Sequence, residues 1–431
     1  MKITVYKTTH LKGNVLIPSS KSHTIRAVII SSLADGVSEI ENALISSDTT
    51  AAVEACRSLG AEISVSGNKL TIRGFNGVPQ NPSKTLDMAN SGTSLNLILG
   101  IVSLGNFETV LDGDESLRSR PVNPLLDALN RLGAKGESVL NNGKPPIKIR
   151  GKIKGGMTKV DGMSSQFVSS LLISTPLCEN DTEIDVFNIH ETPYIDMTIT
   201  WLKEQNIRFD YKKDFSWFRV YGKQTYKHFK KRIPGDWSSA AFPIVAGAIT
   251  GSDIFIAGVD VNDVQGDKAI VEYLRKMGAD ITMEQNGLRI RGCPLKGADI
   301  DLNATPDALP AMAVAGCFAK GETKLYNVAQ ARIKETDRIK VMTGELRKMG
   351  ADVKELKDGL VLKRSSLRGA KVNGHYDHRV VMALSLAGLI AEGETEIDTA
   401  ESVNVTFPGY CEMMQKIEAK INIEEEGYAG K

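Results

Sequence analysis

The chain has 431 residues, of which 42% are hydrophobic and 24% charged, so we expect at least two folded domains and exclude wholesale disorder. The net charge is +1, which excludes a global field that attracts nucleic acid or an anionic membrane and makes any anion site a local feature. The N-terminus lacks the apolar run of a signal peptide, and the longest apolar stretch, residues 380–391, is too short to span a bilayer. Five scattered cysteines without CxxC spacing argue against a disulfide framework and a cysteine-based zinc site. We therefore expect a cytoplasmic protein.

An internal repeat runs through the chain. A tripeptide of the type Leu-Gly-Ala closes a helix-like segment in each copy, and two of the six copies are weaker matches. The tripeptides centre on Gly60, Gly133, Asn206, Gly278, Gly350 and Ala419. The intervals between them are 73, 73, 72, 72 and 69 residues. A helix C-cap glycine explains one such copy, but six at this spacing predict six repeated units.

Each repeat contains the same predicted elements in the same order. An apolar helix rich in small residues comes first, followed by an extended stretch, a second and amphipathic helix (for example residues 50–59 and 269–277), and a final pair of strands. The apolar helices are expected over residues 27–33, 95–104, 168–177, 240–249, 309–318 and 380–390. Helices that alternate with strands at this length predict α/β units that bury a sheet against helices.

A polar cluster precedes each apolar helix. In chain order the clusters are residues 18–26, 90–94, 164–166, 235–239, 305–307 and 375–379. Their Ser, Thr, Asn and Asp residues are ordinary helix N-caps, which is the simplest explanation. Lys21, Arg26 and Arg379, however, lie where the helix dipole repels a cation unless an anionic ligand is bound. The clusters therefore predict sites for anionic ligands.

Six short motifs resemble a known family. They are Ser20-Lys21-Ser22 with Arg26, Asn90-Ser91-Gly92-Thr93, Arg118-Ser119-Arg120-Pro121, Ser164-Ser165-Gln166, Lys334-Glu335-Thr336-Asp337-Arg338 and Asp377-His378-Arg379. In this order, along essentially the whole chain, they resemble the motifs of the 5-enolpyruvylshikimate-3-phosphate (EPSP) synthase family, also called 3-phosphoshikimate 1-carboxyvinyltransferases. The resemblance implies a two-lobed inside-out α/β barrel of six βαβαββ repeats, three in each lobe.

The resemblance also implies how the chain is divided. We place the N-terminal lobe at residues 17–234 and the C-terminal lobe at residues 1–16 plus 235–431, with crossings near residues 16–18 and 233–235. The helix N-termini of both lobes would face one cleft. Cations gathered there in a chain of nearly zero net charge would focus the electrostatic field on the substrates.

The resemblance implies an enzyme of the shikimate pathway, which makes aromatic amino acids. The family transfers the enolpyruvyl group of phosphoenolpyruvate to the 5-hydroxyl of shikimate 3-phosphate and releases phosphate through a tetrahedral adduct. It uses no metal and no cofactor, so we expect these two small molecules as the partners and a monomer as the working form. Two carboxylates and two phosphates require several Lys and Arg, while the proton transfers require an acid and a base.

Residue roles follow from the matched motifs. The residues implied as catalytic are Asp307 as the base, Glu335 as the proton donor to the methylene carbon, and Lys21 beside phosphoenolpyruvate. The residues implied in substrate binding are Lys21, Ser22, Arg26, Asn90, Gly92, Thr93, Arg120, Ser164, Ser165, Gln166, Tyr194, Gln330, Lys334, Arg338, His378 and Arg379. Among these, Ser22 and Arg26 would bind the shikimate carboxylate, and Ser164, Ser165 and Lys334 the 3-phosphate. Asp236 would be a wall residue.

Some of these residues also have simpler structural explanations. The run from Glu335 to Arg338 is also typical of a solvated helical face, and an isolated Asp307 after a proline is typical of an N-cap. An HxxH pair, His375 and His378, has no further ligand at a recognised spacing, so we expect no metal. Cys317 lies in a small-residue helix and is expected to be buried and structural.

Four positions depart from the family pattern. Asn96 replaces an Arg, Glu191 replaces a Ser near the substrate phosphate, and Gln330 replaces an Asn. A Lys usual near Asn404 and Val405 is missing. Glu191 either points away from the phosphate, held by a cation, or marks a substrate without that phosphate. The alternatives are therefore a related enolpyruvyl transferase acting on a different alcohol, or a non-catalytic homologue that binds an anion.

Overall fold

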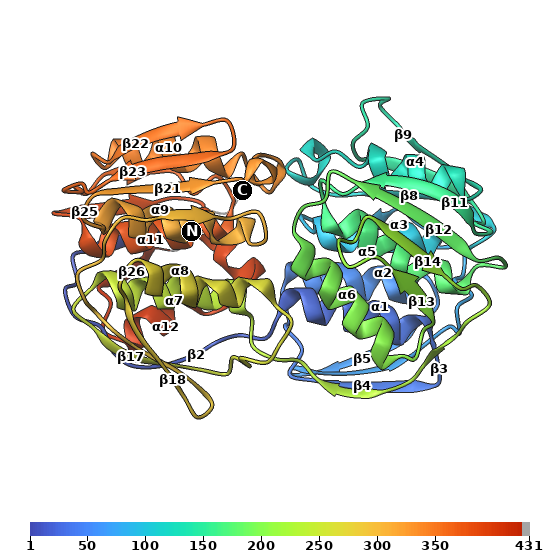
Figure 1. Ribbon diagram of the computed structural model, residues 1–431. Coiled ribbons are helices and arrows are strands. Elements are labelled where there is room, and N and C mark those ends of the chain that lie inside the picture. Colours follow the sequence, from blue (N-terminus) through green and yellow to red (C-terminus); the bar gives the residue numbers. More distant parts are fainter. Residues whose placement is uncertain (425–431) are drawn as a thin grey trace, which may run out of the picture. The chain divides into compact units, whose positions relative to one another are not determined.

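The computed structural model describes residues 1–424 and divides the chain into two compact units (Figure 1). The continuous unit is Ser19–Pro234, and the discontinuous unit joins Met1–Pro18 to the chain from Gly235 onward. The chain thus leaves one unit for the other after Pro18 and again after Pro234. Each unit is described separately below.

The continuous unit contains six α-helices and fourteen strands. Its helices are α1 (Lys21–Leu33), α2 (Ser47–Ser58), α3 (Gly92–Val102), α4 (Asn123–Arg131), α5 (Ser165–Ser174) and α6 (Thr192–Glu204), with 3-10 helices η1 (Leu117–Ser119) and η2 (Thr175–Leu177). Its strands are β3 (Ala34–Asp35), β4 (Val37–Glu41), β5 (Glu62–Ser66), β6 (Lys69–Arg73), β7 (Leu86–Asp87), β8 (Phe107–Asp112), β9 (Ala134–Ser138), β10 (Ile147–Gly151), β11 (Gly156–Asp161), β12 (Thr182–Phe187), β13 (Phe209–Tyr211), β14 (Trp217–Val220), β15 (Tyr226–Lys227) and β16 (Lys230–Arg232).

The described part of the discontinuous unit repeats this plan. Its helices are α7 (Trp237–Ile249), α8 (Ile270–Lys276), α9 (Leu309–Phe318), α10 (Arg338–Lys348), α11 (His378–Ile390) and α12 (Tyr410–Lys416), with 3-10 helices η3 (Gly266–Ala269), η4 (Pro306–Ala308), η5 (Ala329–Ile333) and η6 (Ala400–Val405). Its strands are β1 (Lys2–Tyr6), β2 (Lys12–Leu16), β17 (Asp253–Ala257), β18 (Asp280–Glu284), β19 (Gly287–Arg291), β20 (Asp299–Asp301), β21 (Glu322–Tyr326), β22 (Asp352–Leu356), β23 (Gly359–Lys363), β24 (Lys371–Val372), β25 (Glu394–Ile397) and β26 (Ile421–Glu424).

Six four-stranded sheets share one topology. In each sheet an edge strand pairs in parallel with the second strand, and the other two strands continue antiparallel. The strand orders are β16-β4-β6-β5, β7-β8-β10-β9, β11-β12-β14-β13, β18-β19-β17-β2, β20-β21-β23-β22 and β24-β25-β1-β26. Distant strands complete several sheets: β16 joins the first sheet of its unit, and β1 joins the last sheet of the other. This common topology confirms the predicted six repeats.

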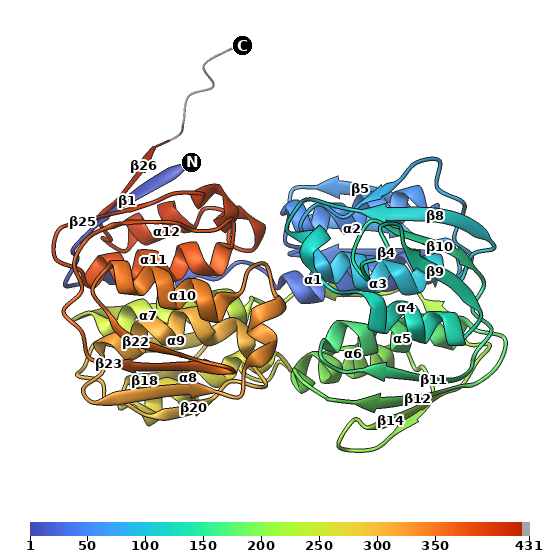
Figure 2. The same cartoon turned by 90° about the horizontal axis from the view of Figure 1, so that it is seen from above.

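The first helix of each repeat is the buried core of its unit. Almost every residue of α1, α3 and α5, and of α7, α9 and α11, is buried, and the sheets cover these helices on the outside (Figure 2). Some begin earlier than predicted: α1 begins at Lys21 rather than at residue 27, because Ser20 is an N-cap that accepts a hydrogen bond from the amide of His23. The helix therefore begins within its polar cluster: residues 18–20 precede α1, and residues 21–26 belong to it.

The second helices of the repeats end alike. The residue after each C-cap has a left-handed backbone, with φ of 106° at Gly60, 115° at Gly133, 56° at Asn206, 93° at Gly278, 88° at Gly350 and 73° at Glu418. Glycine adopts this conformation at low cost, which explains the repeated tripeptide. The sixth copy was predicted one residue too late, at Ala419, because Glu418 does not look like a C-cap glycine in the sequence.

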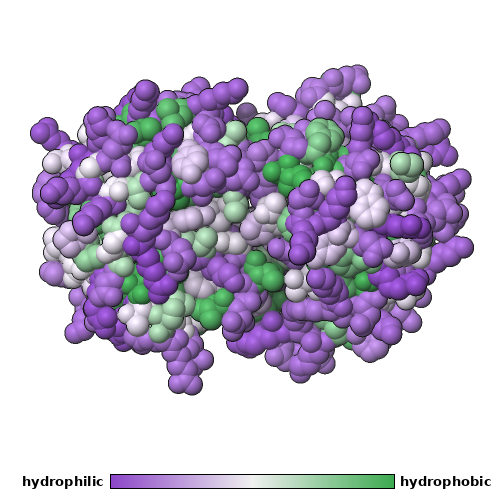
Figure 3. Space-filling view, viewed as in Figure 1, coloured by the Kyte–Doolittle hydropathy of each residue, from purple (hydrophilic) through white to green (hydrophobic). Residues whose placement is uncertain are grey.

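Hydrophobic surface is scattered. The face in Figure 3 is largely hydrophilic, and the exposed large hydrophobic residues, such as Leu16, Val78 and Met157, come from separate parts of the chain. Over residues 1–424, none of the helices is both long enough and apolar enough to cross a membrane. The segment 380–391 forms α11, a buried helix as predicted.

Candidate active site

The N-terminus of α1 presents a partly buried ion pair. Lys21 is the first residue of α1, and its Nζ lies 2.9 Å from Oδ2 of Asp48 at the start of α2. The other carboxylate oxygen of Asp48 is buried without a hydrogen-bond partner in the described structure. Asp48 was not predicted as a site residue, because 27 residues separate it from Lys21 and no short motif joins them.

Arg26, one turn further along α1, is a buried cation. Its side chain donates to Oγ1 of Thr198 (2.9 Å), Oγ of Ser169 (3.3 Å), and the carbonyl oxygens of Ser22 and Tyr194. No carboxylate within residues 1–424 forms a salt bridge with it, and burial lowers its pKa to about 10. A buried guanidinium held only by neutral groups favours an anionic ligand.

The N-terminus of α3 holds a second arginine. Arg120 donates to Oδ1 of Asn90 and to Oγ of Ser116, and its Nε is buried without a partner among the described residues. A Cβ atom added at Gly92 would lie 2.9 Å from Nη1 of Arg120. Gly92 is therefore needed for the close approach of this guanidinium to the first turn of α3.

A chain of side-chain amides links α3 to α5. Asn96 donates to Oε1 of Gln166 (2.7 Å), and Nε2 of Gln166 donates to Oγ1 of Thr93 (3.0 Å). The Oδ1 atom of Asn96 is buried without a partner in the described residues. Asn96 thus orients the Gln166 amide, whereas the Arg usual at this position would add a cation.

Ser165 and Glu191 are in direct contact. Ser164 is the N-cap of α5, and the hydroxyl of Ser165 donates to Oε2 of Glu191 at 2.9 Å. Glu191 is 2% exposed and has a left-handed backbone (φ 55°) just before α6. The carboxylate therefore lies beside the predicted phosphate-binding serines. Tyr194, in the first turn of α6, contributes its carbonyl oxygen to Arg26.

In the discontinuous unit, Arg338 is at the centre of a carboxylate–arginine cluster. Its guanidinium is 0% exposed and donates to both oxygens of Asp377 (2.8 and 3.1 Å), to Oδ1 of Asp307 (2.6 Å) and to Oε2 of Glu335 (2.6 Å). Although burial disfavours the charged form, these carboxylates raise the pKa of Arg338 well above its ordinary value. Asp377 also caps α11 by accepting from the amide of Arg379. We call these five residues the carboxylate–arginine cluster.

Asp307 lies between two arginines. Its Oδ2 is 2.9 Å from the Arg379 guanidinium, and its Oδ1 accepts from Arg338. Burial raises the pKa of Asp307, but Arg379 and Arg338, with help from Lys334, outweigh it and hold that pKa well below the ordinary value. The explanation of Asp307 as a mere N-cap is wrong, because its side chain bonds to arginines.

The structure contradicts a solvated helical face from Glu335 to Arg338. Residues 335–337 precede α10, Asp337 caps it, and Arg338 is buried.

His378, the first residue of α11, is also buried, while His375 contacts Glu345. Gln330 is buried and donates to the carbonyl oxygen of Asn303, with its own Oε1 unpartnered among the described residues. Lys334 follows η5, and Asp236 caps α7 and accepts from Ser239 (2.6 Å).

The position of Asp307 predicts a pH dependence of stability. A carboxyl group whose folded pKa is depressed stabilises the protein above its unfolded pKa, about 3.9, and this contribution is lost as the pH falls toward the folded pKa. We expect the free energies of unfolding of the wild type and of Asp307→Asn to differ by a constant amount between about pH 5 and 8 and to converge below about pH 4. Urea unfolding at a series of pH values measures this difference. A difference that grows in acid would contradict the ion-pair geometry.

The described residues form neither a cluster of metal ligands nor a disulfide. Between residues 1 and 424, no group of three or more His, Cys, Asp or Glu side chains is arranged to hold a metal ion. The five cysteines are free. Cys317 is buried as predicted, and burial raises its pKa to about 12, so that it is a poor nucleophile.

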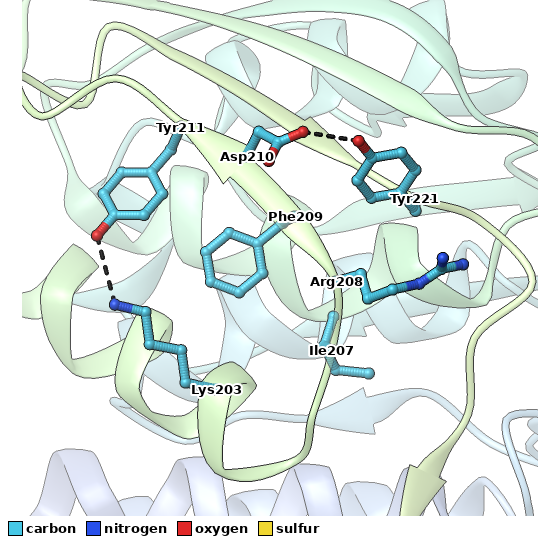
Figure 4. Close-up of a pocket in the computed structure, with 7 residues that line it drawn as sticks. All are labelled: Lys203, Ile207, Arg208, Phe209, Asp210, Tyr211 and Tyr221. Atoms are coloured by element: carbon cyan, nitrogen blue, oxygen red, sulfur yellow. Dashed lines mark hydrogen bonds between the residues drawn. The ribbon is translucent and has the colours of Figure 1, made fainter.

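A surface hollow of about 430 Å³ lies away from these clusters, in the continuous unit (Figure 4). It is lined by Lys203, Ile207, Arg208, Phe209, Asp210, Tyr211 and Tyr221. Two of its polar groups satisfy each other, because the hydroxyl of Tyr221 donates to Asp210 at 2.7 Å. The Lys203 amine donates to the hydroxyl of Tyr211 at 3.4 Å. None of the predicted site residues lines this hollow.

Buried arginines and acids at the helix N-termini of two such α/β units are typical of an enzyme that acts on anionic substrates. Comparison with known proteins identifies the family. The sequence model of the family described as EPSP synthase (3-phosphoshikimate 1-carboxyvinyltransferase) matches residues 5–414. The chain belongs to this family.

Individual relatives match this chain over nearly their whole length. A 3-phosphoshikimate 1-carboxyvinyltransferase of Acetivibrio thermocellus is 51% identical over 410 residues, which cover 95% of this chain and 97% of the relative. One of Methanocaldococcus jannaschii is 42% identical over 426 residues, covering 97% and 99%. A solved structure of the EPSP synthase of Acinetobacter baumannii is 28% identical and superposes with a TM-score of 0.84, covering 98% of this chain and 100% of that one.

Proposed function

We propose that the chain transfers the enolpyruvyl group of phosphoenolpyruvate to the 5-hydroxyl of shikimate 3-phosphate and releases phosphate, a step of the shikimate pathway. The observation that carries the proposal is the family match over residues 5–414. The chain retains the proposed base and acid, Asp307 and Glu335, and lacks two cations that are usual in the family, at Asn96 and near Asn404 and Val405. The resemblance noted in the sequence thus agrees with the family found by comparison.

The carboxylate–arginine cluster supplies the groups for phosphoenolpyruvate. The residues proposed to bind its carboxylate and phosphate are Arg338, Arg379 and Arg120, because the planar guanidinium suits both anions. Lys21 would contact the same substrate. Asp377 fixes the orientation of Arg338 with two hydrogen bonds, while Asp307 and Glu335 accept from its other side, so a ligand would have to share or replace these two contacts.

The continuous unit supplies most groups for shikimate 3-phosphate. Arg26, buried without a carboxylate partner in the described residues, would bind the shikimate carboxylate together with Ser22. Ser164, Ser165 and the N-terminus of α5 would bind the 3-phosphate with Lys334. Gln166 and Tyr194 would line the ring. The other residues proposed to bind the substrates are Asn90, Gly92, Thr93, Gln330 and His378.

Two carboxyl groups would move the protons. In the addition, Asp307 takes the proton of the 5-hydroxyl as its oxygen bonds to C2 of phosphoenolpyruvate, and Glu335 delivers a proton to the methylene carbon C3. In the elimination, the Glu335 carboxylate takes a proton back from C3, the bond from C2 to the phosphate oxygen breaks, and Asp307 gives its proton to the departing phosphate. Without ligands, Asp307 is a weak base, since two arginines depress its pKa. Anionic substrates that bind those arginines would raise that pKa toward the useful range.

We also propose a monomer in the cytoplasm that works without metal or cofactor. The proposed acid, base and substrate-binding residues all come from one chain, so a second copy is not needed for chemistry. Five free cysteines suit a reducing compartment. The two compact units would serve as the two lobes of the family.

The departures from the family pattern are local. Glu191 accepts from Ser165 and so occupies a hydroxyl that the 3-phosphate would use. Asn96 orients Gln166 in place of a cation. Gln330 keeps an amide where the family has Asn, and Asn404 and Val405 end η6 without the usual Lys. The changes at Asn96, at Glu191 and near Asn404 and Val405 alter the supply of donors and cations, and none of the four departures removes a proposed acid or base.

We expect Glu191→Ser to tighten binding of shikimate 3-phosphate and Asn96→Arg to tighten binding of phosphoenolpyruvate. Two unit charges 4 Å apart interact by roughly 4 kcal/mol at an effective dielectric constant of about 20, so removing a carboxylate or adding a cation beside an anion has a large effect. Titration calorimetry of each variant with each ligand measures this. If the wild type already binds both ligands tightly and neither variant binds better, neighbouring residues compensate for the departures.

Phosphate release tests the proposed function. We expect release that requires both phosphoenolpyruvate and shikimate 3-phosphate. If the chain binds phosphoenolpyruvate but releases no phosphate with shikimate 3-phosphate, a related transferase acting on another alcohol is the better explanation. If it binds both ligands and releases no phosphate, it is a non-catalytic anion-binding homologue.

A further inference from the structure

One position in the repeat stands out on the second, outer helix. It lies five residues before the left-handed residue that ends this helix, and it therefore faces the same direction in every repeat. The six residues at this position are Ala55, Ala128, Trp201, Tyr273, Glu345 and Met413. Three of them carry a polar group, and each of the three makes a hydrogen bond to the N-terminal cluster of a neighbouring inner helix.

Trp201 bonds to the first turn of α1. Its indole Nε1–H donates to Nδ1 of His23 at 3.0 Å, and both side chains are buried. Lys231 lies over the indole ring, 4.2 Å from its centroid. His23 is in the same helical turn as Ser22 and three residues from Arg26, so Trp201 fixes the turn that presents both.

Tyr273 bonds to the segment that carries Asp307. Its hydroxyl lies 2.9 Å from Oγ1 of Thr305, which is 0% exposed and directly precedes η4 as its N-cap residue. Pro306 follows, and Asp307 comes next. Burial raises the pKa of Tyr273, so the phenol stays protonated and can take part in this hydrogen bond at neutral pH.

Glu345 bonds to the loop before α11. Its buried carboxylate accepts from the amide of Asn373 (3.0 Å), contacts Nε2 of His375 (3.0 Å) and pairs with Lys348. His375 and Tyr376 are consecutive non-glycine residues with a left-handed backbone, both at φ 54°. Such a backbone persists only where its surroundings hold it. Asp377 and Arg379 follow directly, so Glu345 helps to hold the loop that leads into them.

We propose that Trp201, Tyr273 and Glu345 are positioning residues, and that the repeat uses this one helix position to fix three substrate-binding turns. Trp201 positions the turn of Arg26, Tyr273 the turn of Asp307, and Glu345 the turn of Arg379. Each acts through its partner and does not touch substrate. The inference rests on the proposed function for the roles of the three turns, and on the hydrogen bonds above for the positioning itself.

The three residues act on different parts of the reaction, so steady-state kinetics separates them. We expect Trp201→Phe to raise the KM for shikimate 3-phosphate about tenfold and Glu345→Met to raise the KM for phosphoenolpyruvate about tenfold, since small misplacements of binding groups are costly. We expect Tyr273→Phe to lower kcat about tenfold with little change in either KM. Met413→Leu is the matched control at the same repeat position and leaves all constants unchanged.

Further variants distinguish a loss of positioning from a loss of folding. Thr305→Val breaks the hydrogen bond of Tyr273 from the other side, so it must reproduce the fall in kcat, and the double variant must be no worse than either single one. Glu345→Gln, which keeps an acceptor for the Asn373 amide, must raise the KM for phosphoenolpyruvate less than Glu345→Met does. Variants that melt at lower temperature but keep wild-type kcat and KM would overturn the proposal. Turnover of the wild type reports separately on the proposed function.

Discussion

Replacing Asp307 by Asn or Glu335 by Gln is expected to lower turnover by about 10²–10⁴-fold with little change in substrate binding. Both side chains accept from the buried Arg338 guanidinium, at 2.6 Å in each case. The amides keep the shape and part of this hydrogen bonding, but they cannot take or deliver the proton. Rapid-quench turnover together with calorimetric binding of each substrate separates the two effects.

Asp337→Asn is the matched control for this pair. Asp337 lies in the same motif and loses the same charge, but it pairs with Arg332 and caps α10, where Asn is an equally good N-cap. We expect it to keep near-wild-type turnover. If Asp307→Asn and Glu335→Gln also keep it, the proposed proton transfers are wrong.

Arg26→Met is expected to weaken binding of shikimate 3-phosphate by about 10²-fold or more, since truncating one partner of a buried charge pair costs about 2–5 kcal/mol. The same variant is expected to change the free energy of unfolding of the ligand-free protein by no more than about 1 kcal/mol. The reason is that Arg26 is buried against neutral groups only, and burial already lowers its pKa to about 10. Calorimetry and urea unfolding measure the two quantities.

Arg57→Met serves as the control for Arg26. Arg57 is a half-exposed arginine of α2 in the same unit, paired with Glu54 on its own helix. We expect it to leave substrate binding unchanged. If Arg26→Met lost several kcal/mol of stability and bound shikimate 3-phosphate normally, Arg26 would be a structural residue.

The repeat and the apolar helices could be predicted from the sequence, because both leave regular patterns. Small buried residues recur in each inner helix, and a left-handed residue recurs at the end of each outer one. The starts of the inner helices were less predictable. At α1 the helix begins within its polar cluster, so composition alone placed its first residue too late.

Contacts across the chain could not be predicted from local patterns. Asp48 pairs with Lys21, and Asp377 with Arg338, although 27 and 39 residues separate the partners. Tyr273 and Glu345 looked like ordinary helix residues until the fold brought them to Thr305 and His375. These residues share a repeat position, and a comparison of repeats is the one signal in the sequence that could have found them.

The contact of Glu191 is a further feature that could not be predicted from the sequence. The sequence left two possibilities, a carboxylate turned toward a cation or a substrate without the phosphate. The structure adds a contact that neither possibility contained, because Ser165 donates to Glu191 at 2.9 Å. Ser165 begins α5 and Glu191 directly precedes α6, and only the packing of these two helix ends brings the side chains together, which the sequence pattern does not report.

The central claim is addition of shikimate 3-phosphate to phosphoenolpyruvate followed by elimination of phosphate, with Glu335 as the proton donor to C3. Mass spectrometry of the product formed in deuterium oxide tests it most directly, because a proton added to C3 from solvent and then partly retained leaves deuterium in the methylene group. We predict an enolpyruvyl ether of shikimate 3-phosphate that carries deuterium at this carbon, with wild-type protein and both substrates present. Absence of that ether, or an ether free of deuterium throughout, would contradict the account.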